Sequence, residues 1–341
     1  MKRKVIFIGF LFSILLVFIN SSKKDDFPVL KGPYLGQTPP GMTPEIFAPG
    51  IVSTGYYEQS NSFSPDGKAF YYTIVGPKFG ITLFMQIQHG RWSQPQTVPF
   101  SGKYNDYYPF YSPDGKRLYF VSMRPVSGQG EPKKDFDIWL VESIENHWSE
   151  PQNIGPPVNT ESYELHPTVT NDGTLYFVSS RKGGKGRMDV YRSRLVDGQY
   201  LEPENLGSSI NTEFAESNPY IAPNESYLIF TSHDRPDGYG KYDLYISFRE
   251  TDGSWMKAKN MGNQMNSKDN ESTPNLSHDG KYFFFTSARN SHGSYSELMY
   301  TYDNIKKMLN SPGNGRGDIY WVDAKVIEEL KPEELNKGDK Q

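Results

Sequence analysis

Five acidic residues recur along the chain, and their carboxylates are the first candidates for chemistry. They are Glu58, Asp106, Glu164, Glu216 and Glu271. Each stands just before a run of residues typical of a β-strand. If the repeats close into a ring, these carboxylates surround its axis, where a cation or a sugar would bind. The alternative is a set of structural ion pairs.

An arginine and a second acidic residue recur in four of these repeats. The arginines are Arg124, Arg181, Arg235 and Arg289. The aspartates, which begin a later strand, are Asp137, Asp189, Asp243 and Asp318. Because a guanidinium group is a planar fork of donors, we expect each arginine to bridge two carboxylates. This pattern favours a structural ion-pair network that includes every recurring acid except Glu58.

The first repeat departs from this pattern. Gly76 stands at the position of the arginine, and Thr82 at that of the aspartate. Glu58 keeps its carboxylate without these partners. We therefore expect Glu58 to be the ring member most open to a ligand.

Two residues after each recurring acid lies a second candidate position. Its residues are Ser60, Tyr108, His166, Asn218 and Thr273. Side chains alternate along a strand, so we expect these five to point into the channel at one level. Such a polar set would bind a small polar ligand or only water.

The fifth repeat contains an insertion, residues 290–317, which predicts a short helix. Asp303 is the expected cap, and Pro312-Gly313 the stop. The apolar side of this helix consists of Ile305, Met308 and Leu309. Tyr300 and Tyr302 beside it are further ligand-binding candidates. The insertion is a lid, a plug or a contact site, since long loops of this kind are often functional.

No motif of a known catalytic or metal site is present. The chain has no cysteine, no paired histidines of zinc-protease spacing and no Gly-x-Ser-x-Gly elbow. We expect no metal, no cofactor and no catalytic residue. Glu58 and Asp106 are the one pair that we would nominate for glycoside hydrolysis, which needs two free carboxyl groups.

The elements that would position these residues are revealed by a repeated turn. Its copies are Ser64-Pro65-Asp66-Gly67, Ser112-Pro113-Asp114-Gly115, Asn171-Asp172-Gly173, Pro223-Asn224-Glu225 and Ser277-His278-Asp279-Gly280. An Asp-Gly turn between two β-rich runs is a strong hairpin signal. A third strand follows each hairpin, and a fourth follows it in the first four repeats, so the repeat predicts a four-stranded blade. Five antiparallel blades make an all-β propeller, and six is the alternative.

The fifth repeat lacks its fourth strand, and the N-terminal part of the chain supplies a replacement. Residues 45–52 line up with residues 151–158, so we expect the N-terminal strand to complete the last blade. The predicted organisation is a signal peptide at 1–22, a Pro/Gly-rich extension at 23–44, the propeller at 45–331 and a polar tail at 332–341.

The turns and the strands after them resemble TolB-like, WD-40-like β-propeller repeats of the Pro-Asp type. The similarity covers roughly residues 45–323, and the full Ser-Pro-Asp-Gly form occurs twice. The resemblance implies a propeller, often six-bladed, from an exported bacterial protein. It implies no single activity, because such repeats occur in binding subunits, envelope proteins and enzymes.

Composition and the N-terminus bear on location and partners. Lys2-Arg3-Lys4 precede the apolar residues 5–19, a pattern typical of a secretory signal, or of an uncleaved anchor. The net charge is −4, with no basic stripe for nucleic acid. We expect a periplasmic or secreted, non-catalytic binding or scaffold module for a protein, glycan or cell-envelope partner. The alternative is a carbohydrate-active enzyme, a glycoside hydrolase or polysaccharide lyase, with its site at the channel mouth.

Overall fold

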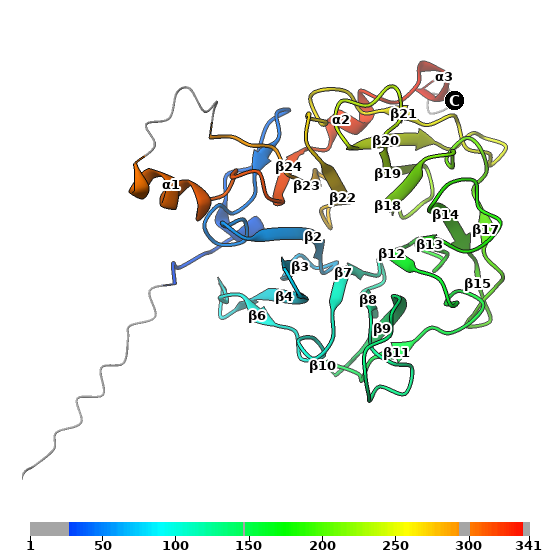
Figure 1. The fold of residues 1–341 in the computed structure, drawn as a ribbon, viewed down its shortest axis with the longest axis horizontal. Coiled ribbons are helices and arrows are strands. Elements are labelled where there is room, and N and C mark those ends of the chain that lie inside the picture. The colour runs from blue at the N-terminus through cyan, green and yellow to red at the C-terminus, as the bar shows by residue number, and fades with distance from the viewer. Residues whose placement is uncertain (1–26, 146, 293–300, 337–341) are drawn as a thin grey trace, which may run out of the picture.

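The computed structural model describes residues 27–145, 147–292 and 301–336. Antiparallel sheets, each of four or five strands, stand side by side around a central axis (Figure 1). Five such sheets form the ring, so the prediction of a five-bladed propeller is confirmed. The predicted signal peptide, residues 1–22, lies outside the described residues.

Each blade runs from an inner strand at the axis to an outer strand at the rim. Blade 1 contains β2 (Tyr57–Phe63), β3 (Ala69–Gly76), β4 (Phe79–Gln88), β5 (Arg91–Trp92) and β6 (Gln96–Thr97). Blade 2 contains β7 (Asp106–Tyr111), β8 (Arg117–Ser122), β9 (Asp137–Ile144), β10 (His147–Trp148) and β11 (Gln152–Asn153). Blade 3 contains β12 (Glu164–Val169), β13 (Leu175–Ser179), β14 (Asp189–Ser193) and β17 (Glu204–Asn205), next to the hairpin of β15 (Leu195–Val196) and β16 (Gln199–Tyr200). Blade 4 contains β18 (Ala215–Ile221), β19 (Tyr227–His233), β20 (Tyr242–Phe248) and β21 (Lys259–Asn260). Blade 5 contains β22 (Glu271–Leu276), β23 (Tyr282–Ser287), β24 (Asp318–Asp323) and β1 (Glu45–Ile46).

The N-terminal strand closes the ring, as predicted. β1 pairs with β24, with Ile46 opposite Tyr320. In blade 2 the equivalent pair is Asn153 and Trp139, so Ile46 corresponds to Asn153. The sequence alignment placed Ile46 one residue earlier. The alignment is therefore wrong by one residue along β1, because the loop after β1 is one residue longer than the loop after β11.

The repeated turn folds through its own side chains. In blade 2 the Ser112 hydroxyl donates to Asp114 at 2.6 Å, and the amide of Arg117 donates to Ser112 at 2.9 Å. Gly115 has φ 72°, in the left-handed region that glycine tolerates best. The turn therefore fixes the hairpin that joins the inner strand to the second strand of the blade.

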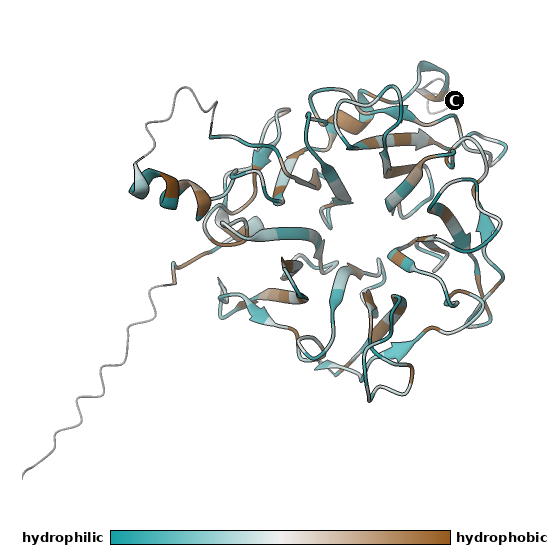
Figure 2. Ribbon diagram, in the orientation of Figure 1, coloured by the Kyte–Doolittle hydropathy of each residue, from teal (hydrophilic) through white to brown (hydrophobic). Residues whose placement is uncertain are grey.

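The core lies between neighbouring blades. The middle strands carry long hydrophobic stretches, whereas inner strands such as β2 are largely hydrophilic (Figure 2). Val178 of blade 3 and Phe230 of blade 4 belong to one buried cluster. Blades therefore adhere through apolar faces while the polar inner strands face the axis.

The segments before and after the propeller pack against it. A 3-10 helix, η1 (Tyr34–Gly36), brings Tyr34 into the core, where its hydroxyl donates to Asp279 at 2.6 Å. After β24, the helices α2 (Lys325–Glu328) and α3 (Glu333–Asn336) follow, and Ile327 of α2 is buried. No helix in the described part of the chain has the length and apolar character needed to span a membrane.

The insertion in blade 5 contains α1 (Tyr302–Leu309). Thr301, not Asp303, is its N-cap, because the Thr301 side chain accepts from the amide of Asn304. The helix lies beside the ring and not over its centre (Figure 1). In this position α1 itself does not plug the channel.

Candidate functional site

The recurring acids lie at the start of the inner strands and are buried. Glu58, Asp106, Glu164, Glu216 and Glu271 each have 0% exposure. Burial raises the pKa of Glu58, Asp106 and Glu164, since a carboxylate loses its hydration there. None of the five carboxylates is open to a ligand.

Four of these acids are bound by the recurring arginines. The distances are 2.8 Å for Arg124–Asp106, 3.4 Å for Arg181–Glu164, 2.8 Å for Arg235–Glu216 and 3.4 Å for Arg289–Glu271. Each guanidinium also donates to a backbone carbonyl, as Arg235 does to Ile210 at 2.7 Å. Aromatic rings pack against the same guanidinium groups. The ring centre of Tyr245, for example, lies 4.5 Å from the guanidinium carbon of Arg235. The ion pairs therefore belong to the packing of each blade.

The aspartates of the third strands have other partners, so the expectation that one arginine bridges two carboxylates is wrong. Among the described residues, no ion pair joins these arginines to Asp137, Asp189, Asp243 or Asp318. Asp189 instead accepts from the amides of Lys185 and Gly186 and from Asn205. Asp137 binds Lys133 at 2.6 Å. These carboxylates hold the preceding loop and the outer strand, away from the arginine.

Sequence reasoning missed the hydroxyl groups that complete this network. Ser179 donates to Glu164 at 2.7 Å and accepts from the Nε of Arg181 at 3.1 Å. Thr160 donates to the same carboxylate through its amide and its hydroxyl. The recurring pair Ser-x-Arg, present at Ser122, Ser179 and Ser287, was the available signal.

Blade 1 lacks most of this network. In the strand register, Ile74 faces Glu58 where other blades have the serine, and Ile81 stands at the aspartate position, one residue before Thr82. Glu58 is held by Thr54, whose amide donates at 3.1 Å. Glu58 has no ion pair among the described residues, but its burial removes it from contact with any ligand in this structure.

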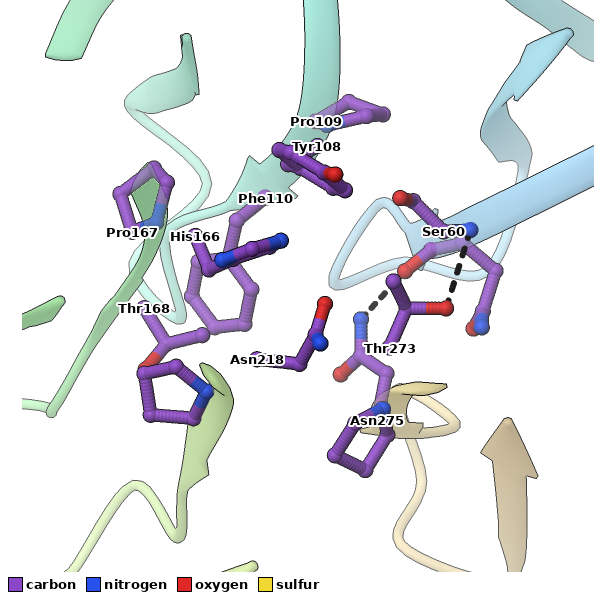
Figure 3. Close-up of a pocket in the computed structure, with 13 residues that line it drawn as sticks. Ser60, Tyr108, Pro109, Phe110, His166, Pro167, Thr168, Asn218, Thr273 and Asn275 are labelled. Atoms are coloured by element: carbon purple, nitrogen blue, oxygen red, sulfur yellow. Dashed lines mark hydrogen bonds between the residues drawn. The ribbon is translucent and has the colours of Figure 1, made fainter. Parts of the chain in front are cut away.

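The second candidate position lines the centre of the channel. Ser60, Tyr108, His166, Asn218 and Thr273 come from the five inner strands and converge on one cavity (Figure 3). Each interrupts the regular pairing of its strand and has a positive φ, from 45° at Thr273 to 57° at Ser60. The bulge turns the side chain toward the axis.

The cavity is small and uncharged. Its volume is about 30 Å³, room for about two water molecules. Of its thirteen lining residues, none is acidic or basic apart from His166. Burial lowers the pKa of His166 to about 3, so the imidazole is neutral at physiological pH. Its ring centre lies 3.8 Å from that of Tyr108.

The remaining candidates lie elsewhere. Tyr300 is outside the described residues, whereas Tyr302 on α1 is 78% exposed. Tyr302 does not belong to the cavity lining. No cluster of three or more potential metal ligands occurs in residues 27–145, 147–292 and 301–336.

Known proteins resemble this chain in structure and not in sequence. No family model and no curated protein matches the sequence. TolB from Acinetobacter baumannii is 15% identical over 78% of this chain and 54% of that chain, with a TM-score of 0.46. This chain thus spans about half of that TolB.

Two further structures align with 82% of this chain and over 92% of their own chains, at 10% sequence identity. They are BT0996 in an RGII complex, with a TM-score of 0.51, and a glycoside hydrolase, with a TM-score of 0.50. These similarities and the ring of five sheets show a β-propeller fold, which the resemblance of the repeats to TolB-like propellers predicts.

Proposed function

We propose that this protein is a non-catalytic, exported binding or scaffold module that presents one face of its propeller to a protein, glycan or cell-envelope partner. We call this the loop face. It contains the starts of the inner strands and the loops between second and third strands. Export is inferred from residues 1–22 alone.

The observation that carries this proposal is the distribution of exposed aromatic side chains. Five aromatic residues of the described chain are strongly exposed. They are Tyr56 (64%), Phe79 (45%), Tyr163 (43%), Tyr239 (52%) and Tyr302 (78%). The first four lie on the loop face. Tyr302 lies on α1, in the long insertion between the second and third strands of blade 5. Aromatic residues are enriched in the contact patches of binding proteins.

The surroundings of Tyr163 illustrate the character of this face. Its hydroxyl donates to the carbonyl of Lys134 at 3.2 Å, and its amide donates to Ser180 at 3.2 Å. Lys134, whose carbonyl accepts this bond, and Lys182, two residues after Ser180, both have exposed side chains. A surface that exposes an aromatic ring and lysines suits a partner with both apolar and anionic groups.

The enzymatic alternative lacks a comparable observation. Hydrolysis of a glycosidic bond needs two free carboxyl groups. Glu58 and Asp106, the nominated pair, are both fully buried, and Asp106 is bound to Arg124. The similarity to a glycoside hydrolase is 10% in sequence and supports the fold alone.

The test is binding of the full chain to a glycan array and to envelope proteins, followed by titration of the purified partner. The triple variant Tyr56→Ser, Tyr163→Ser, Tyr239→Ser should weaken binding about tenfold or more. A matched variant, Val29→Ser, Val196→Ser, Leu201→Ser, changes exposed residues away from the loop face and should bind normally. Equal affinities of the two variants, or glycan cleavage that Glu58→Gln abolishes, would contradict the proposal.

A further inference from the structure

Five buried polar atoms around the central cavity have no hydrogen-bond partner in the described chain. They are Ser60 Oγ, Asn61 Oδ1, Asn61 Nδ2, His166 Nε2 and Thr168 Oγ1. Their residues are only 3–8% exposed. Buried polar groups in native proteins are nearly always satisfied, because an unpartnered one loses the energy of its hydration. Such a concentration around one cavity indicates that something polar occupies it.

The chemistry of these atoms defines the occupant. The hydroxyl groups of Ser60 and Thr168 both donate and accept, and Asn61 supplies one donor group and one acceptor. A hydroxyl group of a ligand also donates and accepts, so it matches every member of this set. The absence of charge among the lining residues other than the neutral His166 disfavours an ion.

The cavity is also preorganised. Prolines follow the channel residues in blades 2 to 5, at Pro109, Pro167, Pro219 and Pro274, and all four line the cavity. Each fixes its own φ, next to a residue already held at positive φ. The Thr273 hydroxyl further accepts from the amide of Ser60 at 3.1 Å, across the junction of blades 5 and 1 (Figure 3). Rigid walls reduce the entropic cost of binding.

We propose that the centre of the channel is a binding site for adjacent hydroxyl groups of a polyol or sugar, which replace two ordered water molecules. Ser60, Asn61, His166 and Thr168 form the hydrogen bonds. Tyr108, which is half-buried, supplies an aromatic wall beside the carbon atoms of the ligand. This site lies deeper along the inner strands than the exposed aromatic residues of the loop face, and it goes beyond the function proposed above.

Titration of the full chain with propane-1,2-diol and glycerol, followed by NMR, tests this site. Amide signals of the inner strands around residues 60, 108 and 166 should shift with a dissociation constant in the millimolar range. Propan-1-ol, which has one hydroxyl group, should bind about tenfold more weakly. Thr168→Val and Asn61→Leu remove unpartnered atoms at nearly constant volume, and each should weaken diol binding by a similar factor.

The controls repeat the same exchanges at exposed positions. Thr251→Val and Asn263→Leu should leave diol binding unchanged. Thermal unfolding of all four variants shows which are folded, and Thr168→Val, the milder cavity change, keeps the test open if Asn61→Leu unfolds. A crystal structure in glycerol with water alone in the channel would overturn the proposal, as would equal diol binding by wild type and Thr168→Val. Neither result would affect the loop-face variants, which test the other proposal.

Discussion

At the scale of single residues, Asp318 differs from Asp137 and Asp189 in one neighbour. In blades 2 and 3 an asparagine of the outer strand donates to the equivalent aspartate, as Asn153 does to Asp137 at 2.9 Å. Ile46 occupies that position in blade 5. The Oδ2 atom of Asp318 accepts a hydrogen bond from the amide of Gly313 at 2.8 Å, but its Oδ1 atom has no partner among the described residues. The strand borrowed from the N-terminus thus leaves one carboxylate undersatisfied.

This difference predicts a pH dependence of stability. Burial, opposed by the Gly313 amide and reinforced by the nearby Glu58, raises the pKa of Asp318 to about 7. The folded state therefore holds a proton that the unfolded state releases near pH 4, so the free energy of unfolding falls between about pH 4 and 7. Asp318→Asn abolishes this loss. At pH 8 the variant should exceed wild type by roughly 2–4 kcal/mol in urea unfolding.

The control for this prediction is Asp252→Asn. Asp252 lies on an exposed turn, where hydrogen bonds from Ser254 lower its pKa. The contribution of Asp252 to the free energy of unfolding is constant above pH 5. The free energy of unfolding of Asp252→Asn should therefore change with pH in the same way as that of wild type. A difference between Asp318→Asn and wild type that stays the same from pH 5 to pH 8 would refute the role given to Asp318.

At the scale of elements, the arginines of blades 2 to 5 connect the start of the inner strand to the end of the second strand. Arg235 follows β19 and reaches Glu216 on β18 and the carbonyl of Ile210 before it. Removing one partner of a buried ion pair leaves a buried charge, which costs about 3–5 kcal/mol. Arg235→Met should lower the free energy of unfolding by about this amount. Glu216→Gln added to Arg235→Met should recover part of the loss, because it removes the orphaned charge.

An exposed pair provides the comparison. Lys68 and Asp66 lie 3.4 Å apart at the surface turn of blade 1, and both side chains are more than half exposed. Such pairs contribute about 0–1 kcal/mol. Lys68→Met should therefore be nearly neutral in the same denaturation experiment. Equal effects of Lys68→Met and Arg235→Met would mean that the buried network does not hold the strands together.

The sequence predicts the elements well where the same residue types recur at the same spacing in successive repeats. The Ser-Pro-Asp-Gly turns, the inner-strand acids and the cavity position of Tyr108 all follow from spacing within a blade. Errors occur where loop length intervenes. Ile46 is misplaced by one residue because its loop is longer, and the partners of Asp189 are amides of the preceding loop. Neither the burial of Glu58 nor the size of the cavity is a local property, so neither is visible in the sequence.

At the scale of the whole molecule, packed aromatic rings join the last blade to the first, and Phe47 is one of them. Phe47, fully buried just after β1, contacts rings from both ends of the propeller. Its ring centre lies 5.2 Å from Phe284 and 5.1 Å from Trp321 in blade 5, and 5.3 Å from Phe70 in blade 1. Phe47 therefore joins the last blade to the first.

We expect Phe47→Ala to cost about 3–5 kcal/mol, since it removes this packing and leaves a cavity at the closure. An exposed residue earlier in the chain offers a control, because Val29 is 62% exposed and Val29→Ala should be nearly neutral. Hydrogen exchange locates the effect: amides of β1, β24 and β2 should lose protection in Phe47→Ala before those of blade 3, which lies across the ring. Uniform loss of protection in all five blades would instead show that the propeller unfolds as one unit, with no weak point at the closure.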